Sequence, residues 1–344
     1  MSDLLARVRR SKLIDLVGLS LVALVVFWLI VNFAKEPAQF TNVALIGFTN
    51  GAIYGLVALG YKLVYGILQL INFAHGDVFA LSGLFASTVI ISFLGLDEDT
   101  GLIVIIGGMI VTLAVVMTLF ALLNATIERV AYKPLRRAPR LAPLITAVGV
   151  SFIVQNVALA FYDVNYRTVP DFIPRTAVFD IGGVSYTWNK LAAIIIVVPV
   201  LIVLTWFVQQ TKQGKAMRAV AQDTEASAMM GIDVNRTISV TFMLAGALAG
   251  AAGIVYLLQF NMRYDTGFEL GLIAFTAAVL GGIGNLTGAV LGALLIGLIQ
   301  SFNEGLSWLA PGSDWTRSIV FGILILILVF RPEGILGEPT PEGA

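Results

Sequence analysis

Cysteine is absent from this 344-residue sequence, and histidine occurs only once, as His75. The lack of cysteine excludes disulfides, thiol catalysis and zinc–thiolate sites. A single histidine excludes a multi-histidine metal cluster built by this chain alone. The sequence also lacks a Gly-x-x-x-x-Gly-Lys-Ser/Thr phosphate loop, because Gly214-Lys215 has no upstream glycine. We therefore expect no catalytic residues, no metal, no cofactor and no ATP site in this chain.

Charged residues are also scarce, at 12% of the chain, which is about half their usual share in soluble domains. Hydrophobic residues make up 58%, more than a water-soluble fold of this size could bury. A helix crosses the hydrocarbon core of a bilayer with about 20 apolar residues. Ten segments reach or approach that length: 13–33, 41–60, 77–95, 101–123, 141–161, 191–209, 237–258, 269–283, 286–303 and 317–330.

These segments predict an all-α integral membrane protein, a polytopic helix bundle of about ten transmembrane segments with short or broken helices. We expect it to form a single transmembrane domain over residues 1–344. The segments 269–283 and 317–330 are short, and 269–303 is either two spans or a re-entrant pair.

The distribution of charge predicts the orientation of the chain. Basic residues gather in three short segments, 7–12, 129–140 and 212–218, whereas the acidic turn Asp97-Glu98-Asp99 contains none. Short loops rich in lysine and arginine remain on the cytoplasmic side of a membrane. Ten crossings place all three basic segments and both termini in the cytoplasm, and the acidic turn outside.

Two connections between the predicted spans are long. The outer one, 162–190, alternates around Gly182-Gly183 in a pattern that predicts a small external hairpin. The inner one, 210–236, is polar and favours helix.

Within the inner connection, Asp223 or Thr224 is placed to cap a short helix that ends at Gly231. The pattern alone favours an amphipathic helix lying on the membrane surface. The alternative is a helix whose apolar face docks in a groove on another protein. That compact apolar face consists of Ala226, Met229 and Met230.

Glycines recur four residues apart in several predicted helices. Small residues at this spacing form a groove in which another helix backbone approaches closely. Ordinary packing within the chain explains such a groove, and a subunit interface or a helix that slides during function are the alternatives. The glycines in question are Gly47, Gly51, Gly55, Gly246, Gly250, Gly284, Gly288 and Gly292.

Polar residues interrupt the apolar sequence after the second predicted span. Asn72, His75 and Asp77 lie there, close to Gly66 and Gly76, which allow the backbone to unwind. Broken helices at membrane depth are tolerated where they line a cavity, so these residues are candidates for lining a solute path. The alternative is a short cytoplasmic turn, with Asp77 near a helix start where its charge suits the dipole.

Six stretches of the sequence carry a resemblance to a known family. They are Gly51–Gly66, Ile71–Asp77, Glu128–Arg137, Gly214–Ala219, Met230–Ile232 and Val279–Asn285. Together they resemble the LivH-type permeases of branched-chain amino-acid ATP-binding-cassette (ABC) transporters, over residues 41–332.

The resemblance implies a permease subunit of an importer in a prokaryotic plasma membrane. It implies four kinds of partner: a second related permease subunit, two ATPases, an extracytoplasmic solute-binding protein and membrane lipid; no nucleic acid is expected. Glu225-Ala226-Ser227 is similar to the EAA-type loop of such permeases, although its third residue differs and the later Ile-x-Leu-Pro part is missing. Residues 214–231 then become the segment that couples to the ATPase. The coupling residues would be Gly214, Arg218, Asp223, Glu225, Ala226, Met229, Met230 and Gly231.

A largely uncharged path with Asn50, Tyr54 and Asn72 nearby fits a neutral or zwitterionic solute, such as a branched-chain amino acid moved by alternating access. It fits urea or short-chain amides equally well. A stand-alone channel or carrier for a neutral solute is the alternative from another class. The near absence of ionisable residues in the middle of the spans disfavours a proton- or sodium-driven carrier.

The predicted orientation can be tested by labelling, because the chain has no cysteine of its own. Single cysteines at positions 136 and 215 should be protected from an impermeant thiol reagent in intact cells, and one at position 98 should react. Labelling of position 136 from outside would contradict the orientation.

Overall fold

The structure, a computed structural model, describes residues 2–69, 72–136, 138–139, 141–282, 285–331 and 333–337. Within these ranges most of the chain is helical. The helices are α1 (Ser2–Lys35), α2 (Pro37–Leu68), α3 (Ala74–Thr88), α4 (Leu102–Ile127), α5 (Leu141–Tyr162), α6 (Trp188–Gln210), α7 (Lys212–Gln222), α8 (Thr224–Met229), α9 (Val234–Gln259), α10 (Thr266–Gly281), α11 (Leu286–Gly305) and α12 (Ser313–Phe330). Three short helical turns continue α3 and α4: η1 (Val89–Phe93), η2 (Glu128–Tyr132) and η3 (Lys133–Leu135). Two strands pair with each other: β1 (Ala177–Ile181) and β2 (Val184–Thr187).

The predicted polytopic bundle is confirmed. Among the described residues, nine helices are long and apolar enough to cross a membrane, and Thr266–Gly281 is a shorter apolar helix. Each of the ten predicted segments coincides with one of these helices. The short one, α10, has 16 residues, or about 24 Å at 1.5 Å per residue, which is less than the hydrocarbon thickness of a bilayer.

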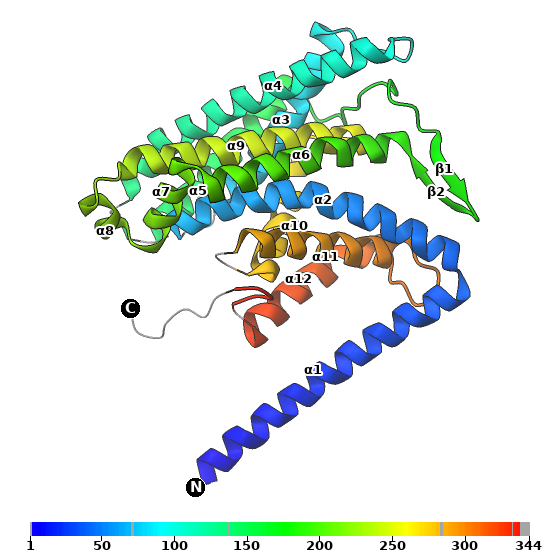
Figure 1. Cartoon of the computed structure of the whole chain (residues 1–344), viewed down its shortest axis with the longest axis vertical. Helices are drawn as coiled ribbons and strands as arrows, with labels where there is room; N and C mark the ends of the chain where they lie inside the picture. The colour runs from blue at the N-terminus through cyan, green and yellow to red at the C-terminus, as the bar shows by residue number, and fades with distance from the viewer. Residues whose placement is uncertain are drawn as a thin grey trace.

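Two helices form the centre of the bundle (Figure 1). In the most apolar stretch of each helix, 78% of the residues of α2 and 72% of those of α9 are buried. The corresponding share is 22% in each of α4, α5 and α6, and 11% in α12. The outer helices turn large apolar side chains outward, such as Ile103 and Phe161. A helix surface of this kind suits contact with lipid. The chain is therefore a multi-pass membrane protein with a buried α2–α9 centre.

Helix α1 leans away from the rest of the bundle (Figure 1). It is joined to the bundle near its C-terminal end, where Trp28 Nε1 and Asn32 Nδ2 donate hydrogen bonds to the carbonyl of Trp308, at 3.0 and 3.2 Å.

Glycines allow α2 and α11 to lie against each other with their backbones in contact. A Cβ atom at Gly47 would come within 2.9 Å, and one at Gly51 within 2.7 Å, of a Cα atom of α11. Both distances are shorter than any ordinary contact of a side chain, so no larger residue fits. At Gly55 the nearest atom would be 3.8 Å away, and the contact there is ordinary.

Two further glycine pairs also pack within the chain. Gly246 and Gly250 of α9 face the backbone of α4, and a Cβ at Gly250 would lie 3.1 Å from an α4 Cα atom. Gly288 and Gly292 of α11 face the backbone of α10, where a Cβ at Gly292 would lie 2.6 Å from a backbone nitrogen. Gly284 lies outside the described residues. Ordinary helix packing thus accounts for both pairs, as it does for Gly47 and Gly51.

The predicted hairpin is confirmed as β1 and β2, an antiparallel pair. Gly182 and Gly183 form its turn with φ of +62° and +82°, values that favour glycine. The hairpin rests on the first turns of α2, where Asn42 Nδ2 donates to the Gly183 carbonyl at 2.8 Å. The Tyr186 hydroxyl and Thr49 Oγ1 share a hydrogen bond of 2.8 Å, and burial raises the pKa of the Tyr186 hydroxyl.

The substitution Gly288→Leu tests the contact between α10 and α11. A leucine side chain there would collide with the α10 backbone, so we expect the free energy of unfolding to fall by about 3 kcal/mol. The measurement is the temperature at which the purified permease loses its monodisperse peak in detergent. Gly107→Leu on α4 is the control, because no atom lies within 4 Å of its Cβ position. Equal heat resistance of the two variants would mean that Gly288 faces lipid.

Candidate functional site

Helix α7 is fastened to the end of α6. Thr211 caps α7 by accepting a hydrogen bond from Gly214 N at 3.0 Å, and Gly214 is buried against the carbonyls of the last α6 turn. Arg218 donates to the carbonyls of Val208 and Gln209, which are among the unpaired groups at the α6 C-terminus. Gly214 and Arg218, expected as coupling residues, thus fix the angle between α6 and α7.

Helix α8 begins and ends as the sequence predicts. Asp223 is its N-cap, and the Asp223 Oδ1 atom accepts hydrogen bonds from the backbone of Glu225 and Ala226, both at 2.9 Å. The helix ends at Met229, and Gly231 follows two residues later with a φ of +82°, the left-handed conformation common after a helix. This cap and stop hold a six-residue helix in one orientation.

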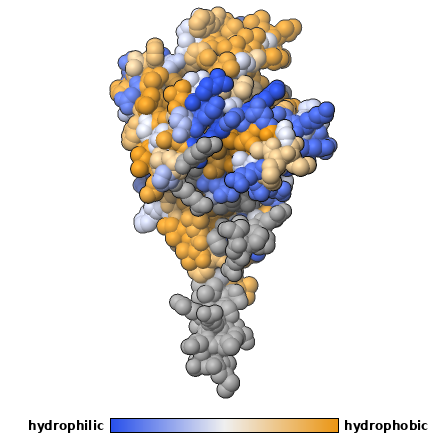
Figure 2. Space-filling view, turned by 90° about the vertical axis from the view of Figure 1, so that its left-hand side faces the viewer, coloured by the Kyte–Doolittle hydropathy of each residue, from blue (hydrophilic) through white to orange (hydrophobic). Residues whose placement is uncertain are grey.

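Two methionines project from α8. The Met229 and Met230 residues are each 83% exposed, whereas Ser227 on the other side of the helix is buried. Figure 1 places α8 at one end of the bundle, opposite the hairpin, and Figure 2 shows that hydrophilic residues gather on that end. An exposed pair of flexible apolar side chains within a polar surface is suited to contact with another protein.

The predicted break between the second and third spans is present. Helix α2 ends at Leu68, Gln69 takes the left-handed conformation with φ of 51°, and α3 begins at Ala74. Asn72 lies in the connection and is 1% exposed. Its Oδ1 atom accepts a hydrogen bond from the Tyr132 hydroxyl at 2.6 Å.

His75 and Asp77 lie in the first turn of α3 and are also buried. The His75 ring contacts α2, edge-on to Tyr61 with 4.8 Å between ring centroids. The Asp77 carboxylate instead faces α5, where it accepts hydrogen bonds from Ser151 Oγ and, at 3.0 Å, from Gln155 Nε2. The polar groups of the break therefore point toward three different neighbours.

Asn50 and Tyr54 lie near the middle of α2 and face α11. Asn50 Nδ2 is 3.5 Å from Ser301 Oγ, and the Tyr54 hydroxyl donates to Gln300 Oε1 at 2.8 Å. In the part of the chain that the structure describes, no hydrogen bond joins these two residues to those of the break. The five path candidates thus form one group on the α2–α11 contact and another around the start of α3.

Sequence reasoning missed two buried charged residues. The Lys62 ammonium donates to the carbonyls of Gly282, at 2.9 Å, and Asn285, and so satisfies carbonyls at the α10–α11 turn. Glu128 is fully buried and pairs with Arg136. Two features of the sequence could have indicated them. Lys62 lies just beyond the predicted 41–60 span, and Glu128 is a lone acidic residue beside the basic segment 129–140.

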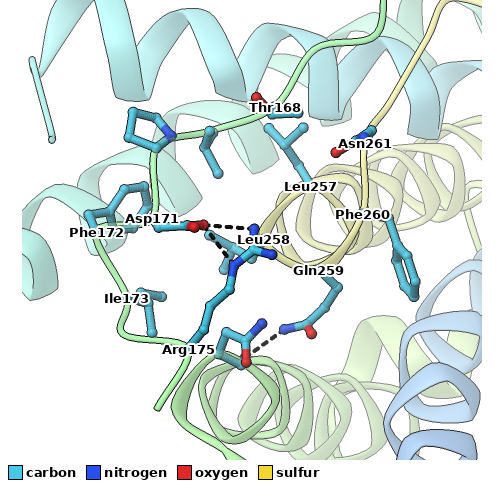
Figure 3. A pocket seen from close by; sticks show the side chains of 13 residues that line it. Thr168, Asp171, Phe172, Ile173, Arg175, Leu257, Leu258, Gln259, Phe260 and Asn261 are labelled. Atoms are coloured by element: carbon cyan, nitrogen blue, oxygen red, sulfur yellow. Dashed lines mark hydrogen bonds and ion pairs between the residues drawn. The ribbon is translucent and has the colours of Figure 1, made fainter. Parts of the chain in front are cut away.

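A small pocket lies between the loop at 168–175 and the end of α9 (Figure 3). Asp171 and Arg175 form an ion pair at its rim, and Gln259 Nε2 donates to the Asn189 carbonyl at 2.6 Å. The pocket is partly open and its volume is about 30 Å³, which is enough for a water molecule but not for an amino acid. We therefore do not assign the solute site to this pocket.

Comparisons with known proteins agree on one family. Residues 43–329 match the family described as "Branched-chain amino acid transport system / permease component". The high-affinity branched-chain amino acid transport system permease protein BraD of Pseudomonas aeruginosa is 36% identical over 302 residues, covering 86% of this chain and 95% of BraD. The corresponding LivH of Escherichia coli is 35% identical over 314 residues, covering 90% and 99%. A probable LivH of Methanocaldococcus jannaschii is 28% identical, covering 82% and 88%.

The substitution Asp223→Ala tests the cap of α8. Loss of two hydrogen bonds to the first turn should weaken this helix by about 1 kcal/mol and speed its amide hydrogen exchange about fivefold. The measurement is hydrogen–deuterium exchange of residues 225–231. Asp233→Ala is the matched control, because Asp233 caps α9 through Arg236 N and should affect the start of α9 alone. Unchanged exchange in α8 would contradict the assigned cap.

Proposed function

The chain belongs to the branched-chain amino acid transport permease family, and on this basis we propose that it is a transmembrane subunit of an ATP-driven importer. Its solute would be a branched-chain or other small neutral amino acid; the names of its relatives state branched-chain amino acids for those proteins. The partners would be a second related permease subunit, two ATPases and an extracytoplasmic solute-binding protein.

One observation supports the ATPase contact above all: the two exposed methionines of the capped helix α8. A helix lying on a membrane surface usually carries basic residues, which attract anionic lipid. The segment 223–229 carries Asp223 and Glu225 and no basic residue. An acidic, six-residue helix with an apolar tip therefore fits a protein groove better than a lipid surface.

Alternating access is the mechanism that we propose. The binding protein would deliver solute at the face that carries the β1–β2 hairpin, and both chain termini would be cytoplasmic. ATP binding would bring the two ATPases together and displace α8. Because α7 is fastened to α6 and α8 leads directly into α9, this displacement would reach the membrane helices at both ends of residues 214–231.

The solute path is proposed along α2 and the start of α3. Asn50 and Tyr54 would lie toward the outer side, and Asn72, His75 and Asp77 toward the inner side. All five are buried in the present conformation, so the path would open only when helices around α2 and α3 separate. This arrangement fits weak and transient contacts with a neutral or zwitterionic solute.

The coupling role can be tested with Met229→Asp and Gly231→Val in the complete reconstituted transporter. The first places a charge in a docking surface, and the second obstructs the left-handed helix stop. We expect solute-stimulated ATP hydrolysis and uptake to fall more than about tenfold. The permease should still insert in the membrane, and the binding protein should still bind solute.

The external hairpin offers matched controls for both variants. Ile181→Asp changes a similarly exposed apolar residue, and Gly182→Val obstructs another left-handed glycine with free space around it. Because the hairpin lies on the face proposed to receive the binding protein, the readout for these controls is assembly. Neither should reduce the amount of ATPase that copurifies with the permease, whereas Met229→Asp and Gly231→Val should. If Met229→Asp and Gly231→Val both transport like the wild type, the ATPase contact lies elsewhere and α8 is a surface helix.

A further inference from the structure

A second cluster of buried apolar side chains lies apart from the main core, at the end of the bundle that carries α7 and α8. It joins Val64 of α2, Tyr132 of η2, Val220 of α7 and Phe242 of α9. Ile232, which follows α8, and Phe73, which precedes α3, pack against it. The coupling segment and the α2–α3 break therefore share one small core, which we call the inner core.

Hydrogen bonds tie the start of α9 to the segment 128–136. Ser239 Oγ donates to Glu128 Oε2 at 2.7 Å, and Arg136, which pairs with Glu128, donates to Asn235 Oδ1 at 2.7 Å. Glu128 is fully buried, and separating a buried carboxylate from its partners is strongly unfavourable. The first turns of α9 and the segment 128–136 should therefore move together.

The inner halves of α4 and α9 are also held together. Asn124 Nδ2 of α4 donates to the Phe242 carbonyl of α9 at 2.7 Å, an extra bond to a helix backbone. Gly246 lies directly against the α4 backbone, with no space for a Cβ atom. Close-packed contacts of this kind transmit displacement rather than absorb it. Helices α4 and α9 with residues 128–136 thus form one body, which we call the α4–α9 body.

One side chain of this body is bonded to the α2–α3 break. The Tyr132 hydroxyl donates to Asn72 Oδ1 at 2.6 Å, and both residues are 1% exposed. The Tyr132 ring lies on Phe242 of α9, with 5.5 Å between ring centroids. Asn72 stands two residues before α3 and its backbone carbonyl accepts a hydrogen bond from His75 N at 3.1 Å.

We propose that Tyr132 is a positioning residue that passes displacement of the coupling segment to the start of α3. The proposal rests on the proposed function in taking α8 as the ATPase contact. When α8 moves, the α4–α9 body moves with it, and the Tyr132 hydroxyl carries Asn72 along. His75 and Asp77, one and three residues into α3, then change their positions against α2 and α5.

The hydroxyl of Tyr132 is the group that the proposal depends on. A phenylalanine ring at this position would fill the same space but could not form the hydrogen bond. The inner core around the ring is apolar, and a buried hydroxyl in such a place requires a hydrogen-bond partner. Its partner is a side chain at a helix break rather than a carbonyl within a regular helix. A bond between two buried groups in a low-dielectric surrounding is costly to break, so the joined segments move together.

Tyr132→Phe in the complete reconstituted transporter tests this proposal, with solute moved per ATP hydrolysed as the readout. We expect that ratio to fall about fivefold while solute-stimulated ATP hydrolysis is retained. Tyr162→Phe is the matched control, since its hydroxyl bonds to Thr88 at 3.2 Å elsewhere in the bundle, and it should leave the ratio unchanged. Asn72→Ala should match Tyr132→Phe, and the double variant should be no worse than the worse single variant.

The purified permease gives a second readout that needs no partner. Amide exchange of His75 should speed up in Tyr132→Phe, because its bond to the Asn72 carbonyl loses its support, while exchange in α8 stays the same. A wild-type ratio in Tyr132→Phe, or strictly additive losses in the double variant, would overturn the proposal. So would equal losses of uptake and ATP hydrolysis, which indicate a structural role. Failure of the proposed function is distinct, because the wild-type transporter itself would then show no solute-stimulated ATP hydrolysis.

Discussion

A backbone amide or carbonyl left unpaired in hydrocarbon costs several kcal/mol, and this constraint explains how the α10–α11 turn is built. At the α10–α11 turn the Lys62 ammonium satisfies the carbonyls of Gly282 and Asn285. The segment 333–337 supports the same turn, since its amides bond to the carbonyls of Leu280 and Gly281 at 2.9 and 3.1 Å. Both devices keep non-helical backbone inside the protein and away from lipid.

The break before α3 is built differently. Asn72 and Asp77 accept hydrogen bonds from η2 and α5, and the His75 ring packs edge-on against Tyr61 of α2. A change in the position of any one of these elements therefore alters the surroundings of the α3 start. The break is the point where buried polar groups and the inner core meet, which is why both the proposed path and the proposed coupling involve it.

Hydropathy predicted the fold because a membrane span must be both long and apolar, and few other structures meet both conditions. The cap and stop of α8 were equally predictable, since Asp223 and Gly231 act on atoms within a few residues of themselves. The partners of Lys62 and Tyr132 were not, because they lie 220 and 60 residues away in sequence and depend on how each helix is rotated. For the same reason glycine spacing identified the grooves but not the helices that fill them.

The glycine contacts also have a mechanical consequence. Where two helices touch backbone to backbone, neither can turn about its own axis without driving a side chain into space that holds only a hydrogen atom. The α2–α11 pair and the α4–α9 pair are therefore each expected to move as a rigid unit. Helix α3 contacts α2 of the first pair and α9 of the second pair. Relative movement of the two pairs would therefore shift the start of α3, which follows the end of α2 at Leu68 by a few residues.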